Sequence, residues 1–155
     1  MKQRFPLRAL NRPMLCALVA CSGSGESGRR AFPPARPPDL PDMERTELAA
    51  SFVGHYLGAL ERLLHDSVIV QPPKPDSARQ GPAAIRYLTY LATHTEATES
   101  RLQPSVVTPE GPFVFEQGMW ELKIGDRPRL GRYTLRWRQT PNGWKVVLWS
   151  WSTFK

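Results

Sequence analysis

Hydrophobic residues recur at steps of three and four in two segments of the chain, which is the spacing of a buried α-helical face. The first segment predicts a helix from about residue 43 to Leu64, because Asp42 follows Pro41 and can cap a helix N-terminus. The second predicts a helix from Pro82 to about His94, since proline fits the first turn of a helix. The inward residues are expected to be Leu48, Phe52, Val53, Tyr56, Leu57, Leu60, Leu63 and Leu64 in the first helix, and Ala84, Ile85, Leu88 and Leu91 in the second.

Short apolar runs bounded by proline, glycine and asparagine predict β-strands. One such run lies between the two helices, and four follow the second helix, so an antiparallel run of four strands is expected. Gly118 is expected to form a bulge or bend. The chain of 155 residues should therefore form one small α+β domain. The expected strands are 68–70, a run ending after 106–107, 113–124, 130–139 and 144–154.

The last two strands carry the clearest patterns. Residues 130–139 alternate, with Tyr133, Leu135 and Trp137 on one face and arginines or threonine on the other, so one face is buried and one is wet. The final strand is apolar on both faces, which indicates that it is covered on both sides. Its two expected faces are Val146 with Leu148, and Val147 with Trp149 and Trp151.

The N-terminus has the pattern of an export signal, predicted to span residues 1–20. A basic region precedes an apolar run of seven residues, 14–20, which is too short for a bilayer-spanning helix of about 20 residues. The signal holds four of the basic residues and no acidic one, so the net charge of +7 falls to +3 in the remainder. That charge, without a basic stripe among exposed aromatics, argues against a nucleic-acid partner.

The segment Leu18, Val19, Ala20, Cys21 resembles the lipobox of bacterial lipoproteins. The resemblance implies that Cys21 is lipidated and becomes the first residue of the mature chain, anchored in the bacterial cell envelope. Ser22 resembles a signal for the outer membrane, with the domain facing the periplasm. Cleavage elsewhere, or a leader in front of a mis-assigned start, is the alternative. If Cys21 is lipidated, residues 21–42, which are rich in Ser, Gly and Pro, would be a tether for a domain of residues 43–155.

The domain resembles the NTF2-like superfamily of ketosteroid isomerases, SnoaL-type cyclases and DUF4440 domains over about residues 44–155. The matching segments are Asp66–Val70 before Pro72, Gly81 before a helix with Ile85 and Tyr87, and Gly131–Trp137 with Pro141–Ser150. The resemblance implies a cone: two or three N-terminal helices packed on a curved antiparallel sheet. It also implies that relatives often dimerise, so a homodimer through the outer sheet face is one hypothesis.

The isomerases of this family carry a carboxylate base in the strand after the first helix, just before a proline. That position here is Gln71, whose neutral amide cannot abstract a proton. The isomerases also have an acid that donates a hydrogen bond to the oxyanion. The nearest match here is Tyr133, whose hydroxyl could still donate such a bond. The resemblance therefore supplies no confident catalytic residue, and Tyr133, Tyr56 and His55 are weak candidates.

No cofactor and no metal are predicted, because His55, His65 and His94 have no paired spacing on one helix and the domain lacks cysteine. The leading hypothesis is a membrane-tethered, non-catalytic module that binds a small apolar ligand or an envelope protein partner. An isomerase, dehydratase or cyclase using general acid and base chemistry is the alternative. The predicted pocket residues are Tyr56, Gln71, Tyr87, Trp120, Tyr133, Leu135, Trp137 and Leu148.

Overall fold

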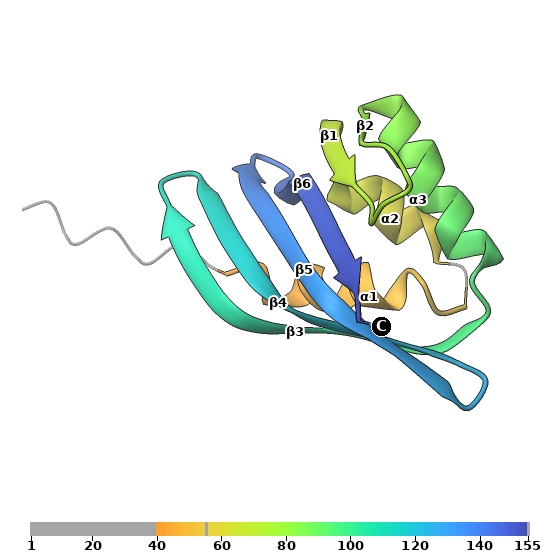
Figure 1. Ribbon diagram of the computed structural model, residues 1–155. Helices are drawn as coiled ribbons and strands as arrows, with labels where there is room; N and C mark the ends of the chain where they lie inside the picture. Colours follow the sequence, from red (N-terminus) through yellow and green to blue (C-terminus); the bar gives the residue numbers. More distant parts are fainter. Residues whose placement is uncertain (1–39, 55, 155) are drawn as a thin grey trace, which may run out of the picture. The chain divides into compact units, whose positions relative to one another are not determined.

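The computed structural model describes residues 40–54 and 56–154. In this region three helices pack against one six-stranded sheet of order β2-β1-β6-β5-β4-β3 (Figure 1). The sheet is strongly curved, α1 lies behind β4 and β5 in the view of Figure 1, and α3 lies beside β1 and β2. The elements are α1 (Asp42–Ala50), α2 (Leu57–Leu63), β1 (Leu64–Gln71), β2 (Arg79–Gln80), α3 (Pro82–His94), β3 (Ala97–Glu110), β4 (Phe113–Ile124), β5 (Arg127–Thr140) and β6 (Gly143–Thr153).

The predicted α+β class and the antiparallel run of four strands, β3 to β6, are confirmed. β1 adds to this run in parallel with β6, which makes the whole sheet mixed. The predicted bounds of α3 and β4 agree with the structure, whereas β3 begins at Ala97, well before the Val106–Val107 pair that indicated it. The first half of β3 was missed because exposed polar residues dominate it.

The single helix predicted from 43 to Leu64 is wrong, because α1 ends at Ala50 and α2 begins at Leu57. Gly54 has a φ of +70°, a left-handed conformation that glycine adopts without steric cost. Val53 bridges to Ala97 at the start of β3, so the break is also held by backbone pairing. The helical spacing continued through the break because Phe52, although outside a helix, still packs against the core.

The core lies between the helices and one face of the sheet. The alternation predicted for β5 is confirmed, with Tyr133, Leu135 and Trp137 buried, Arg132, Arg136 and Arg138 exposed, and Thr134 half-buried. Leu60 and Leu63 of α2 and Leu88 of α3 are fully buried against this face. Within residues 40–54 and 56–154, none of the helices combines the length and apolar character that a membrane span requires.

The predicted faces of β6 are wrong in one respect. Trp137 is paired with Val146, but the preceding Arg136 is paired with Leu148, so Val147 is an extra residue in β6. An extra residue of this kind reverses the side-chain alternation beyond it. Leu148 therefore lies on the outer face with Arg136, while Trp149 and Trp151 join Val146 on the inner face.

Gly118 does not itself form the expected bulge but lies opposite one in β3. Between Pro104 and Val106 the register of β3 shifts against β4, which leaves Ser105 as the extra residue beside Gly118. A Cβ atom at Gly118 would lie 2.1 Å from the backbone oxygen of Gln103, far closer than van der Waals contact. The curved sheet thus depends on the close backbone approach that glycine permits.

Gly118→Ala is expected to lower the free energy of unfolding by about 1–3 kcal/mol, because the added methyl group collides with backbone that cannot rotate away. Urea denaturation followed by circular dichroism would measure the change. Gly58→Ala is the matched control, since a Cβ atom there meets nothing within 4 Å and alanine favours the helix. Equal stability of the two variants would contradict this account of Gly118.

Candidate ligand-binding site

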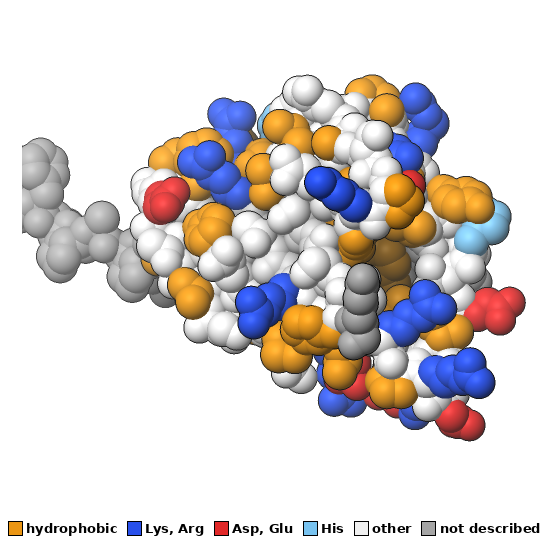
Figure 2. Space-filling model, viewed as in Figure 1, with side chains coloured by type: hydrophobic (Ala, Val, Ile, Leu, Met, Phe, Trp, Pro, Cys, Tyr) orange, Lys and Arg blue, Asp and Glu red, His pale blue; other side chains and the backbone are white. Residues whose placement is uncertain are grey.

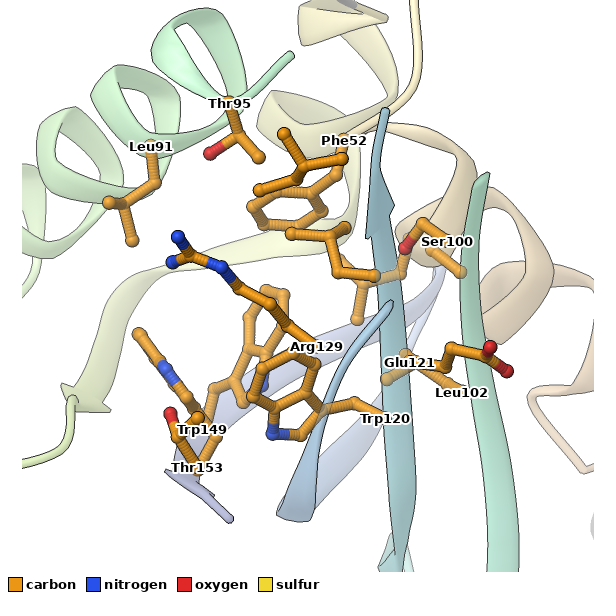
Figure 3. Close-up of a pocket in the computed structure, with 15 residues that line it drawn as sticks. Phe52, Leu91, Thr95, Ser100, Leu102, Trp120, Glu121, Arg129, Trp149 and Thr153 are labelled. Carbon is orange, nitrogen blue, oxygen red and sulfur yellow. The ribbon is translucent and has the colours of Figure 1, made fainter. Parts of the chain in front are cut away.

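A cavity of about 240 Å³ opens between α1, the break after it, α3 and the inner face of β3 to β6. Figure 3 shows its side chains converging from these elements, and Figure 2 shows a hollow with a hydrophobic floor beside the C-terminal end of β6. Most of the lining is apolar. The lining residues are Leu48, Ala49, Phe52, Leu91, Thr95, Ser100, Leu102, Trp120, Glu121, Leu122, Ile124, Arg129, Trp149, Trp151 and Thr153.

A chain of aromatic rings forms one wall of the cavity. Phe52 meets Trp149 edge to face with 5.7 Å between ring centroids, and Trp149 lies 5.7 Å from Trp151. Tyr87 of α3 stacks on Trp151 with a centroid distance of 6.4 Å. Rings packed in these arrangements support one another, so the wall is fixed before any ligand arrives.

Trp120 on β4 is also fixed in place. Its indole Nε1 donates a hydrogen bond of 2.9 Å to the backbone oxygen of Ser152 on β6, across the intervening strand β5. The indole can cross β5 because Gly131 lies directly opposite Trp120; a Cβ atom there would be 2.5 Å from Nε1. One glycine therefore sets the orientation of an aromatic lining residue.

The lining holds few polar groups. Thr95, Ser100 and Thr153 contribute hydroxyl groups, and Arg129 and Glu121 are the ionisable residues of the lining. In Figure 3 the Arg129 side chain extends into the cavity, whereas the Glu121 carboxylate is directed away from it. The interior therefore presents aromatic surface with one cation.

A buried cluster of polar side chains ties α1 to the sheet. Glu116 on β4 is fully buried, and its Oε1 accepts hydrogen bonds from Arg45 Nε at 2.8 Å and from the Tyr133 hydroxyl at 2.6 Å. Arg45 also donates from Nη1 to Asp42 Oδ1 at 2.8 Å. Burial and then the hydrogen bond to Glu116 raise the pKa of the Tyr133 phenol. Burial alone would lower the pKa of Arg45, but Glu116 and Asp42 outweigh burial and raise it.

Trp120 is the residue of the predicted pocket set that lines this cavity. Tyr133, Leu135 and Trp137 lie buried on the inner face of β5, and the lining does not include them. Tyr87 stands behind the aromatic wall and donates a hydrogen bond of 2.9 Å to Asp76. Burial, and then this hydrogen bond, raise the pKa of Tyr87 to about 12.

The other predicted residues lie elsewhere. Tyr56 is 69% exposed at the start of α2, Gln71 is exposed at the end of β1, and Leu148 faces outward because of the bulge at Val147. Of the weak catalytic candidates, Tyr133 is bound to Glu116, and His55 lies outside the described residues. Within the part of the chain that the structure describes, no group of three His, Cys, Asp or Glu side chains is placed to hold a metal ion.

Sequence reasoning missed Arg45, Glu116 and Arg129, and it placed Phe52 on the buried helical face without assigning it to the cavity. Glu116 has the same strand parity as Val114, Gly118 and Trp120, and this alternation was the signal that could have placed it inside. Arg129 likewise shares the parity of Gly131 and Tyr133, but it precedes the predicted start of its strand. Arg45 gave no comparable signal, because it is a charged residue in the first turn of a helix.

Arg45→Met is expected to lower the free energy of unfolding by about 3–5 kcal/mol, because it leaves the buried Glu116 carboxylate without its cation. Adding Glu116→Gln should restore part of this loss. Arg62→Met is the matched control, since the pair of Arg62 with Glu47 is exposed and should contribute less than about 1 kcal/mol. Urea denaturation of the four proteins would test this, and similar losses for Arg45→Met and Arg62→Met would refute it.

The sequence matches no protein-family model, and it is not similar enough to any curated protein to count as a match. Solved structures do match its fold. An NTF2-like protein from Cytophaga hutchinsonii has 18% sequence identity and a TM-score of 0.58, over 72% of this chain and 93% of that one.

Two further solved structures share the fold. A predicted dehydratase of the NTF2-like family from Streptomyces avermitilis has 16% identity and a TM-score of 0.63, over 74% of this chain and 93% of that one. A predicted ketosteroid isomerase from Parabacteroides distasonis has 19% identity and a TM-score of 0.59, over 76% and 90%. Together with the cone of three helices on a curved six-stranded sheet, these matches show that the chain has the NTF2-like fold.

Proposed function

We propose that this protein binds a small, flat apolar ligand in the aromatic cavity and does not transform it. The observation that carries the proposal is the fixed wall of Phe52, Trp149 and Trp151, which stands with Trp120 around a cavity instead of filling it. Pockets lined by apolar and aromatic side chains with a few polar groups are the usual sites for small molecules.

The size of the cavity limits the ligand. Its volume of about 240 Å³ lies just below the usual range of about 300–1,000 Å³ for ligand sites, which suits a molecule of one or two rings. Burying a side chain as large as Phe or Leu gains about 1.5–3 kcal/mol. A two-ring ligand would gain a few times this amount, from which the costs of association are then subtracted.

The chemistry of the lining favours binding over turnover. General acid or base catalysis requires a titratable group within hydrogen-bonding reach of the substrate. Of the two ionisable lining residues, Arg129 is a permanent cation and Glu121 is directed away (Figure 3). Gln71, at the position that matches the base of the isomerases, carries no titratable group.

General acid and base catalysis is a second candidate, which the Tyr133–Glu116 pair favours. The Tyr133 hydroxyl would have to turn its single proton from Glu116 Oε1 to an oxyanion, while Glu116 Oε2, which has no hydrogen-bond partner among the described residues, could accept a proton. Both groups are buried outside the cavity lining, so a substrate would have to displace part of the core to reach them. This cost places catalysis second.

We also propose that the domain is tethered to the bacterial cell envelope through Cys21, with residues 21–42 as the spacer. The lipobox pattern of Leu18 to Cys21 supports this proposal. Each buried methylene of an acyl chain contributes about 0.8 kcal/mol to membrane affinity. A tethered domain would hold its ligand close to the membrane surface.

Leu91→Trp is expected to weaken binding of 2-naphthamide, a neutral two-ring probe, by about 10-fold or more, because the indole would occupy the cavity. Isothermal titration calorimetry would measure the dissociation constant. Tyr90→Trp is the matched control, since Tyr90 directly precedes Leu91 in α3 and is exposed. Equal binding by both variants, or no binding to the wild type, would refute the cavity as the ligand site.

Cys21→Ser is expected to move the protein from the membrane fraction to the soluble fraction of a Gram-negative host, because serine cannot carry the thioether-linked lipid. Cys16→Ser is the control, since Cys16 lies within the apolar run before the lipobox. Fractionation followed by immunoblotting would measure the distribution. A membrane pool that Cys21→Ser leaves unchanged would rule out the lipid tether.

A further inference from the structure

Arg129 places a cation inside the aromatic cavity. It lies on β5 opposite Leu122 of β4, two residues from Gly131, and so belongs to the inner face of the sheet. Figure 3 shows its side chain extending from the strand into the cavity, with the guanidinium directed toward Leu91 of α3. A charged group is thus presented to a space whose walls are mainly apolar.

The guanidinium of Arg129 has no carboxylate partner among residues 40–54 and 56–154. Several other arginines of this region do have one: Arg45, Arg62, Arg101 and Arg136 each lie within 4 Å of an Asp or Glu oxygen. Glu121, the acidic residue of the lining, points away from the cavity (Figure 3). The positive charge at this site is therefore not balanced by the cavity itself.

A guanidinium in this setting is suited to an anion. Its planar fork matches a carboxylate with two parallel hydrogen bonds, and it is more weakly hydrated than an ammonium group. Because Arg129 remains exposed as a whole residue, the pair would form toward the mouth of the cavity, with the apolar body of the ligand deeper inside.

We infer that the ligand of this cavity is an amphipathic carboxylate, whose ring system packs against Trp120 and Trp149 and whose anionic group pairs with Arg129. The inference rests on the proposed binding function and makes its ligand specific. The two ends of the site are set by different parts of the chain. The aromatic side chains select a flat apolar body, and Arg129 selects its charge.

The test compares 2-naphthoate with 2-naphthamide, which share one ring system and differ in charge. The full chain carrying Cys21→Ser would be used, so that no attached lipid competes for the probes. Isothermal titration calorimetry should show that the wild-type cavity binds the carboxylate about 10-fold more tightly than the amide, the lower end for a hydrogen bond to a charged group. Arg129→Met should remove this preference by weakening carboxylate binding alone.

Arg138→Met is the matched control, because Arg138 is an exposed arginine of the same strand on the opposite face, paired with Phe113. It should leave both dissociation constants unchanged. Raising the salt concentration from 20 to 300 mM should weaken binding of the carboxylate but not of the amide.

The outcomes separate the two proposals. If the amide binds as tightly as the carboxylate, or Arg129→Met weakens both probes equally, the cavity binds ligands but the charge selection is refuted. If neither probe binds the wild type, the binding function and the inference both fall. A preference for the carboxylate that Arg138→Met abolishes would also overturn the role given to Arg129.

Discussion

The position of α1 on the sheet depends on one buried ion pair. Arg45 of α1 and Glu116 of β4 are 71 residues apart in the chain, yet they meet at 2.8 Å with Tyr133 on the same carboxylate oxygen. Burying both charges costs free energy that only a precise geometry offsets, so the pair strongly disfavours other positions of α1. The next turn of α1 and the residues directly after it then bring Leu48, Ala49 and Phe52 to the cavity, which makes the ligand site a consequence of where this helix is held.

Much of the fold follows from periodicity alone. The alternation in β5 and the proline at the start of α3 predict both elements correctly, because each reflects a local preference of the backbone. The sequence did not predict the break between α1 and α2, because Phe52 and Val53 lie in the loop yet continue the hydrophobic spacing of a helix. The bulge at Val147 was hidden for a similar reason: β6 is apolar on both faces, so the reversal of its alternation leaves no mark in the sequence.

The candidate site was less predictable than the fold. Trp120 could be assigned to the pocket because one strand face is enough to place it inside. The partnership of Arg45 with Glu116 depends on how a helix crosses a sheet, which local patterns do not encode. Tyr133, Leu135 and Trp137 were assigned correctly to the inner face, but their distance from the cavity depends on which end of the sheet the helices leave uncovered.

The aromatic wall also affects the intrinsic fluorescence of the protein. Trp120, Trp149 and Trp151 are three of the five tryptophans in the chain, and all three border the cavity. Their indoles emit light with a wavelength and yield that depend on the polarity of what touches them. The protein therefore carries an intrinsic optical reporter of its own occupancy, without any attached dye. If a ligand is purified with the protein, the tryptophan emission would change when that ligand is extracted.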